Sequence, residues 1–230
     1  VVSVDAAAGT LCDSTGRSHG PFDLVIAADG AHSALRSAAP SLVHGHPMYP
    51  WGAVWCLLPA ESWPLGDVLQ QRYGGVREMI GVLPVGRRAD REGRWLTFFF
   101  SLPGDAVDSF DAPALARLRD RVGTLWPELS ALLANIESPE QLHRARYRDV
   151  RLRRPATGRL VFVGDAAHAM SPQLGQGVNM ALLDAAALAD AVQEAPTTDA
   201  ALLDYGRRRR SHLAVYQQLS RWLTPLFQSD

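Results

Sequence analysis

Lysine is absent from this chain, and cysteine is scarce. All 23 basic residues among the 230 are arginine, a bias that GC-rich coding DNA explains better than selection for anion binding, so we draw no function from it. Cys12 and Cys56 are too few and too far apart for a disulfide framework or a cysteine metal site. This cysteine usage is typical of a reducing compartment, and we expect a cytoplasmic protein.

Long apolar runs and net charge are also missing. No stretch approaches the ~20 consecutive apolar residues of a membrane span. The formal net charge of −1 provides no general field to attract nucleic acid or an anionic membrane. With 47% hydrophobic and 20% charged residues, the composition is that of a globular protein with a sizeable core.

The order of apolar runs and turn residues predicts the secondary structure. A hairpin within residues 1–22 leads to a buried strand, "FDLVIAA", and residues 31–39 favour a short helix. Strands at 48–59, 77–86 and 94–103 form an antiparallel block, and Asp111 caps a helix that ends before Pro127. Another strand, "RLVFVG", is followed by helices at 178–193 and 199–223, the second capped by Thr198.

Two strands share one pattern, a continuous apolar run that ends at an Asp beside a Gly. The runs "DLVIAADG" and "RLVFVGDA" bring Asp29 and Asp165 to their ends. Continuous apolar runs indicate strands covered on both faces, as in parallel sheets, where ligands lie beyond the carboxyl ends of the strands. Either motif alone could be a simple turn. Together they predict two carboxylates at a ligand site, each beside a glycine that lets the backbone approach.

A pair of glycines follows the second motif. In "LGQGVNM", Gly175 and Gly177 precede the apolar pattern Val178, Leu182, Ala185 and Leu188 of a helix. The unpaired N–H groups of that helix start would face an anionic or electron-rich group, either a phosphate or the pyrimidine edge of a reduced flavin. The spacing does not match a G-x-G-x-x-G fingerprint.

These residues resemble a known family. "DLVIAADGAHSALR" and "RLVFVGDAAHAMSPQLGQGVNMALLDAAALADA" are similar to the Asp-Gly and Gly-Asp motifs of single-component flavoprotein monooxygenases of the p-hydroxybenzoate hydroxylase type. The resemblance covers about 50 of the 230 residues. It implies an α/β fold with segments 1–40 and 151–196 in an FAD-binding domain, a β-rich substrate domain at 41–150 and a C-terminal helix at 197–230.

The resemblance also implies residue roles. Asp165 binds the ribitol of FAD, Gly164 allows its backbone to approach, and Pro172 lies against the isoalloxazine. Asp29 and Gly30 lie near the pyrophosphate and the path of NADPH or NADH, with Arg36 as a supporting cation. The N–H groups of Gly177, Val178 and Asn179 meet the pyrimidine edge of the ring, and Gly175 and Gln176 also belong to the cofactor-binding residues.

The function implied is an FAD- and NAD(P)H-dependent monooxygenase. It would insert one oxygen atom of O2 into an aromatic or other electron-rich small molecule through a flavin hydroperoxide, so the cofactor performs the chemistry and no catalytic side chain is named. Three alternatives remain open: an FAD-linked reductase, a flavin-dependent halogenase, and an inactive remnant or binding module.

One departure from the family concerns its first βαβ unit. The chain begins at Val1 and contains no G-x-G-x-x-G turn, so we interpret it as a fragment and expect it to bind FAD weakly or not at all by itself.

Four further features have simpler explanations. His168 is expected to pack or hydrogen-bond rather than act as an acid or base, and His44 and His46 to be solvated rather than metal ligands. The run 207–210, "RRRR", is expected to be a solvated face paired with Asp204, although one or two of its arginines could reach a phosphate or a partner. The aromatic residues are expected first in the core, and some of them could line a substrate pocket: Trp51, Trp55, Tyr73, Trp95 and Phe98–Phe100.

Overall fold

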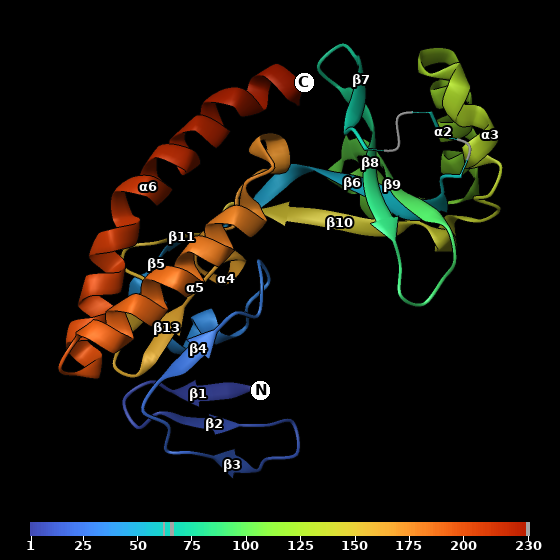
Figure 1. Cartoon of the computed structure of the whole chain (residues 1–230). Coiled ribbons are helices and arrows are strands. Elements are labelled where there is room, and N and C mark those ends of the chain that lie inside the picture. Colours follow the sequence, from blue (N-terminus) through green and yellow to red (C-terminus); the bar gives the residue numbers. More distant parts are fainter. Residues whose placement is uncertain (62, 65–66, 229–230) are drawn as a thin grey trace. The chain divides into compact units, whose positions relative to one another are not determined.

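The computed structural model describes residues 1–61, 63–64 and 67–228. The chain divides into two compact units (Figure 1). The first comprises residues 1–48 and 147–224, and the second comprises residues 49–146 together with the residues from 225 on. The assignment of one unit to the cofactor and the other to the substrate stays a prediction.

The first unit begins with a small antiparallel sheet. The predicted hairpin is confirmed and gains a third strand, so that β1 (Ser3–Asp5), β2 (Thr10–Cys12) and β3 (Ser18–His19) pair in sequence order. A short 3-10 helix, η1 (Leu35–Ala38), lies within residues 31–39, where a short helix was predicted, and a second, η2 (Pro40–Leu42), follows it. A second antiparallel pair joins β5 (Val43–Gly45) to β11 (Arg151–Leu152).

The central sheet of this unit joins the two motif strands. Its order is β12 (Ala156–Thr157), β13 (Leu160–Phe162) and β4 (Val25–Ala27), with β13 parallel to β4. All three residues of β13 are fully buried, as the continuous apolar run predicts. The same prediction is wrong for Ile26 of β4, which is 53% exposed, because the α5 and α6 side chains that cover Val161 do not extend over it.

Four helical segments follow β13: α4 (Asp165–His168), η5 (Pro172–Leu174), α5 (Gly177–Glu194) and α6 (Thr198–Phe227). The two long helices are confirmed, and α6 is four residues longer than predicted at its C-terminal end (227 against 223). Its predicted cap is wrong by one residue, since the Oγ1 atom of Thr197 accepts the hydrogen bond from the N–H of Ala200 at 3.2 Å. Helices α5 and α6 pack together over Val161 (Figure 1).

The buried face of α5 differs from the predicted one. Leu188 is buried, as the pattern predicts, but Val178 is 75% exposed and Leu182 is 63% exposed. The other residues of α5 that face the interior are Met180, Asp184 and Ala191. The apolar pattern did not include Asp184, which is fully buried. Asp184 is buried because neighbouring donors satisfy its carboxylate.

The second unit is a five-stranded antiparallel sheet covered on one face by helices. The order is β10 (His143–Arg148), β6 (Met48–Pro59), β9 (Arg94–Pro103), β8 (Glu78–Arg87) and β7 (Gln70–Gly74). The predicted antiparallel block is therefore confirmed. Its remaining helical segments are α1 (Gly104–Asp108), α2 (Ala112–Leu125), η3 (Pro127–Leu129), α3 (Ser130–Leu133) and η4 (Pro139–Gln141).

The core of this unit lies between the sheet and α2 and α3. Phe98 and Phe100 of β9 pack there with Leu118 and Val122 of α2, and burying each such side chain contributes about 1.5–3 kcal/mol. Helix α2 starts where predicted, because the Asp111 carboxylate accepts a hydrogen bond from the Ala114 N–H at 2.8 Å.

Candidate functional site

The two Asp-Gly motifs meet at one edge of the central sheet. The parallel register pairs Val161 with Ile26 and Phe162 with Ala27, so both strands end side by side. Asp29 follows β4 by two residues, and Asp165 follows β13 by three. Both carboxylates are exposed at this edge. The expectation that they face one ligand site therefore has a geometric basis.

Gly164 turns the chain at the end of β13. Its φ of +56° and ψ of −141° belong to a region that residues with a Cβ avoid, and a Cβ there would lie 3.1 Å from the Cβ of Ala181. Its N–H donates to Asp184 Oδ2 at 2.7 Å. The turn is thus held from the middle of α5.

The start of α5 presents unpaired donors beside Asp165. The first i→i−4 hydrogen bond of the helix is donated by the N–H of Met180 to the carbonyl of Gln176, so the N–H groups of residues 177–179 precede it, and no side chain caps them. A Cβ built on Gly177 would lie 3.8 Å from Asp165 Oδ1. The site therefore combines a carboxylate with the positive end of an 18-residue helix.

The other residues predicted at this site are also accessible. Pro172 is exposed and opens η5, and Gly175 ends η5 with a φ of +60°. Gln176 donates from Nε2 to the carbonyl of Leu174 at 3.4 Å and accepts at Oε1 from Nδ2 of Asn179 at 3.0 Å. These contacts order the loop that leads into α5.

Behind this surface lies a buried ionic cluster of Asp184, His168 and Arg209. Asp184 Oδ2 is 2.5 Å from His168 Nε2, and Oδ1 accepts from Nε of Arg209 at 2.6 Å. Burial acts to raise the pKa of Asp184, but the hydrogen bond and charge of His168 and the donors of Arg209 and Gly164 outweigh it, so that the pKa lies below its usual value. His168 therefore hydrogen-bonds in the interior, as predicted.

The cluster also corrects the interpretation of the "RRRR" run. Arg207 and Arg208 pair with Asp204 as predicted, at 3.2 and 2.5 Å. Arg209 is buried and does not belong to a solvated face. Four consecutive helical residues point in different directions, so one of them can face the interior when a buried acid is available.

Arg36 connects the two motifs. Its guanidinium donates to the carbonyls of Ala31 at 2.5 Å and Ala166 at 2.9 Å, and more weakly to that of Gly30 at 3.5 Å. Burial lowers its pKa, with a contribution from Arg148, while Asp29 opposes that shift. Its proposed role as a cation for FAD is not tested by these contacts and stays a prediction.

A cavity of about 410 Å³ opens beside Arg36. His32, Ser33, His46 and Arg148 contribute to its walls, and Nε of Arg148 donates to Nδ1 of His32 at 3.0 Å. The buried Oγ of Ser33 has no hydrogen-bond partner among the described residues. Sequence reasoning missed this site, because Arg148 and His32 are 116 residues apart and no local pattern links them.

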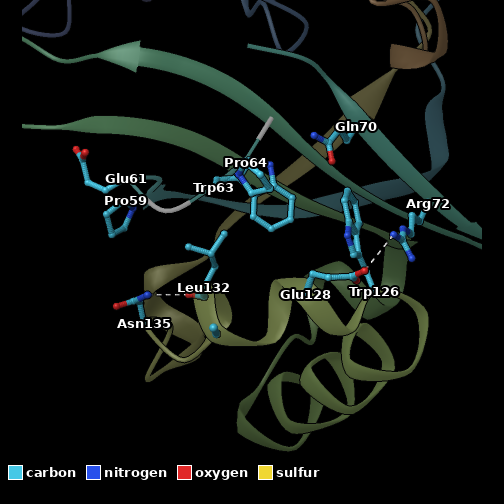
Figure 2. Close-up of a pocket in the computed structure, with 11 residues that line it drawn as sticks. Pro59, Glu61, Trp63, Pro64, Gln70, Arg72, Trp126, Glu128, Leu132 and Asn135 are labelled. Carbon is cyan, nitrogen blue, oxygen red and sulfur yellow. Dashed lines mark hydrogen bonds and ion pairs between the residues drawn. The ribbon is translucent and has the colours of Figure 1, made fainter. Parts of the chain in front are cut away.

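The second unit has its own pocket, of about 510 Å³ (Figure 2). Figure 2 shows Trp63 and Trp126 on its wall, with ring centroids 5.8 Å apart in an edge-to-face arrangement. Arg72 lies 4.9 Å from the Trp126 ring and 3.6 Å from the Glu128 carboxylate. Neither tryptophan was among the aromatic residues predicted for a pocket.

The predicted aromatic residues divide between the two faces of the sheet. Phe98 and Phe100 lie in the core, as expected. Phe99 points to the opposite face, together with its cross-strand neighbours Trp55 and Gly81. A Cβ on Gly81 would lie 2.0 Å from the Phe99 ring, so the ring covers this glycine.

In the described part of the chain, no three His, Cys, Asp or Glu side chains are grouped so that they could hold a metal ion. Among the same residues, no helix is both long enough and apolar enough to cross a membrane.

Comparison with known proteins gives one family and several relatives. A family model described as "FAD binding domain" matches residues 17–220. The FAD-dependent urate hydroxylase of Klebsiella pneumoniae is 27% identical over 208 residues, which cover 81% of this chain and 47% of that protein. The chain thus spans about half the length of the curated relatives it matches.

Solved structures give the same fold. The tetrameric form of 2-methyl-3-hydroxypyridine-5-carboxylic acid oxygenase matches with a TM-score of 0.78 at 22% identity, over 97% of this chain and 60% of that one. A variant of HpxO from Klebsiella pneumoniae, complexed with FAD, matches with a TM-score of 0.74 at 26% identity, over 94% of this chain and 55% of that one. The predicted α/β fold class is therefore confirmed.

Proposed function

This chain belongs to the FAD binding domain family, and from that membership we propose that it binds the flavin of an FAD- and NAD(P)H-dependent monooxygenase. The proposed reaction hydroxylates an aromatic or other electron-rich small molecule, as the names of its relatives suggest. The observation that carries the proposal is the parallel pairing of β13 with β4, since it brings Asp29 and Asp165 to one edge beside the uncapped start of α5.

The residues at this edge fit a flavin. Asp165 supplies an acceptor for ribitol hydroxyls, and the N–H groups of residues 177–179 supply donors for the electron-rich edge of the ring. The helix dipole stabilises negative charge at that position. Exposed Pro172 offers an apolar surface for the ring, and Gly164, which has no Cβ, can adopt the positive φ of the turn.

The cavity beside Arg36 fits the nicotinamide co-substrate. Arg148 and the two histidines, His32 and His46, offer donors to a phosphate, and Ser33 Oγ offers a hydroxyl that the protein leaves without a partner. The open face of the second unit fits the organic substrate, because Phe99 and Trp55 present ring surfaces there. When bound, FAD would supply electron transfer and oxygen activation, and the side chains would bind, orient and exclude water.

The central test is flavin binding by variants of Asp165. We expect Asp165→Ala to raise the Kd for FAD about tenfold, measured by flavin fluorescence quenching, because one hydrogen bond from ribitol to a charged acceptor is lost. Asp23→Ala removes another exposed carboxylate, one that precedes β4, and should leave the Kd unchanged. Equal Kd values for parent and Asp165→Ala would refute the assignment of Asp165, and the absence of measurable FAD binding by the parent would refute flavin binding by this chain.

Oxygen consumption separates the related reactions. A monooxygenase consumes O2 with NAD(P)H and substrate, a reductase consumes none, and a halogenase requires halide. An oxygen electrode with and without halide distinguishes the three, and flavin binding without any turnover would instead favour a binding module.

A further inference from the structure

A groove of about 880 Å³ runs along α6 in the first unit. One wall is α6 between Asp199 and Gln217, and the other is the segment 152–158 that leads into β12 and its turn. The nineteen helical residues from Asp199 to Gln217 span about 27 Å between their first and last Cα atoms, so the groove is long enough for an extended small molecule. None of the residues proposed to contact FAD lines it.

Three arginines in this groove have no partner. Arg153, Arg154 and Arg210 line it, and their guanidinium groups form no hydrogen bond or ion pair with any residue that the structure describes. Two other arginines of α6, Arg207 and Arg208, do have partners. Both form ion pairs with Asp204, and Arg208 also pairs with Glu194. Asp199 is the one acidic residue among those that line the groove. The groove therefore carries uncompensated positive charge.

The concave shape of the groove strengthens the electrostatic potential that these arginines produce. Charges of one sign along a groove with low-dielectric walls concentrate the potential inside it, more than the same charges on a convex surface. The floor includes His168 and Arg209, whose side chains both hydrogen-bond to Asp184. A ligand would thus meet the three arginines without disturbing the buried cluster.

The groove also has an apolar part. Leu202 is buried against α5, while Leu203 is 70% exposed and lines the groove with Leu213 and Pro155. An exposed leucine alone has no significance, but here it lies in the same concavity as the unpaired cations. The complementary ligand has a negative head and an apolar body.

We propose that this groove binds an anionic amphiphile, a carboxylate or phosphate head on an apolar chain, with the head at Arg153, Arg154 and Arg210 and the chain along Leu203. Two sources share this chemistry: a free fatty-acid-like molecule and an anionic lipid in a membrane surface. The proposal is independent of the flavin site, and it gives the last arginine of the "RRRR" run a role that ion pairing does not provide.

Titration calorimetry with dodecanoate on the purified full chain tests the proposal. We expect Arg210→Gln, and separately the double variant Arg153→Gln with Arg154→Gln, to weaken binding about fivefold or more, because charge-assisted hydrogen bonds are lost. Arg17→Gln is the matched control, since Arg17 is exposed outside the groove. None of these variants removes a side-chain contact of the fold, so unchanged thermal unfolding confirms that each is folded.

Two further comparisons test the two parts of the ligand. Acetate lacks the apolar chain and dodecyltrimethylammonium has the opposite charge, so neither should bind measurably. Leu203→Asn should weaken dodecanoate binding, whereas Val215→Asn, an exposed site on α6 outside the groove, should not. Equal binding of the cationic amphiphile, or an equal loss in Arg17→Gln and Arg210→Gln, would overturn the proposal.

Sedimentation with vesicles separates the two sources. Retention on phosphatidylglycerol vesicles but not on phosphatidylcholine vesicles, lost in Arg210→Gln, identifies a lipid head group. Binding of dodecanoate without vesicle retention identifies a free amphiphile. If neither dodecanoate nor phosphatidylglycerol vesicles bind, the proposal is wrong. Flavin binding should be the same in parent and Arg210→Gln, so failure here leaves the proposed function unaffected.

Discussion

The carboxylate of Asp184, in the middle of α5, accepts a hydrogen bond from the backbone N–H of Gly164 at 2.7 Å. One buried side chain thus holds the turn from which Asp165 projects. The same carboxylate pairs with Arg209 of α6, so the strand tip and both long helices share one fully buried acid. Because the proposed flavin surface is built on this turn, its geometry depends on a residue that does not touch the ligand.

Removing the charge of Asp184 should destabilise the folded protein. We expect Asp184→Asn to lower the free energy of unfolding by about 3 kcal/mol, since it leaves Arg209 buried without its counter-charge. Asp190→Asn is the matched control, because Asp190 is exposed and lies 3.8 Å from Arg208, and it should cost less than about 0.5 kcal/mol. Urea unfolding measures both, and equal losses would contradict the role of the cluster.

The same residue should make stability pH-dependent in acid. The folded pKa of Asp184 lies below its ordinary value of 3.8, so its contribution is complete above about pH 4 and is lost as the pH falls through the folded pKa. Unfolding free energies of parent and Asp184→Asn, measured from pH 7 to pH 3, should therefore converge as the pH falls. A constant difference over that range would show that Asp184 does not titrate with a lowered pKa.

Gly164 should tolerate a methyl group less well than another glycine with positive φ. Gly16 has a φ of +83° and an open surrounding, so Gly16→Ala should cost about 1 kcal/mol from backbone strain alone. Gly164→Ala adds the contact with Ala181, and we expect about 2–3 kcal/mol in the same chemical unfolding measurement. Similar costs at both positions would mean that α5 moves away freely.

The two thiols should differ in reactivity. Burial raises the pKa of Cys56 to about 11, so only about one molecule in a thousand carries its thiolate at pH 8. Cys12 is partly exposed. A disulfide reagent at pH 8 should therefore label one thiol rapidly in the native protein and both in urea. Rapid labelling of two thiols in native protein would place Cys56 outside the core.

Local patterns in the chain predicted much of the fold correctly. The Asp111 cap, the run of β13 and the hairpin of β8 and β9 each depend on residues close together in sequence, where propensity and hydrogen bonding within a few residues decide the structure. The two Asp-Gly motifs were also evident, because each follows its own strand directly.

The wrong predictions concern residues whose environment is set by partners far away in the sequence. The sequence pattern placed Arg209 on a solvated face and did not single out Asp184, since a single charged residue is rarely buried. Only the tertiary structure brings them within 2.6 Å, with His168 and the Gly164 N–H completing the satisfied set. The sequence alone therefore determined the elements and the chemistry at their ends. The tertiary structure decided which charges are buried, because a carboxylate can leave water only where donors from other segments replace it.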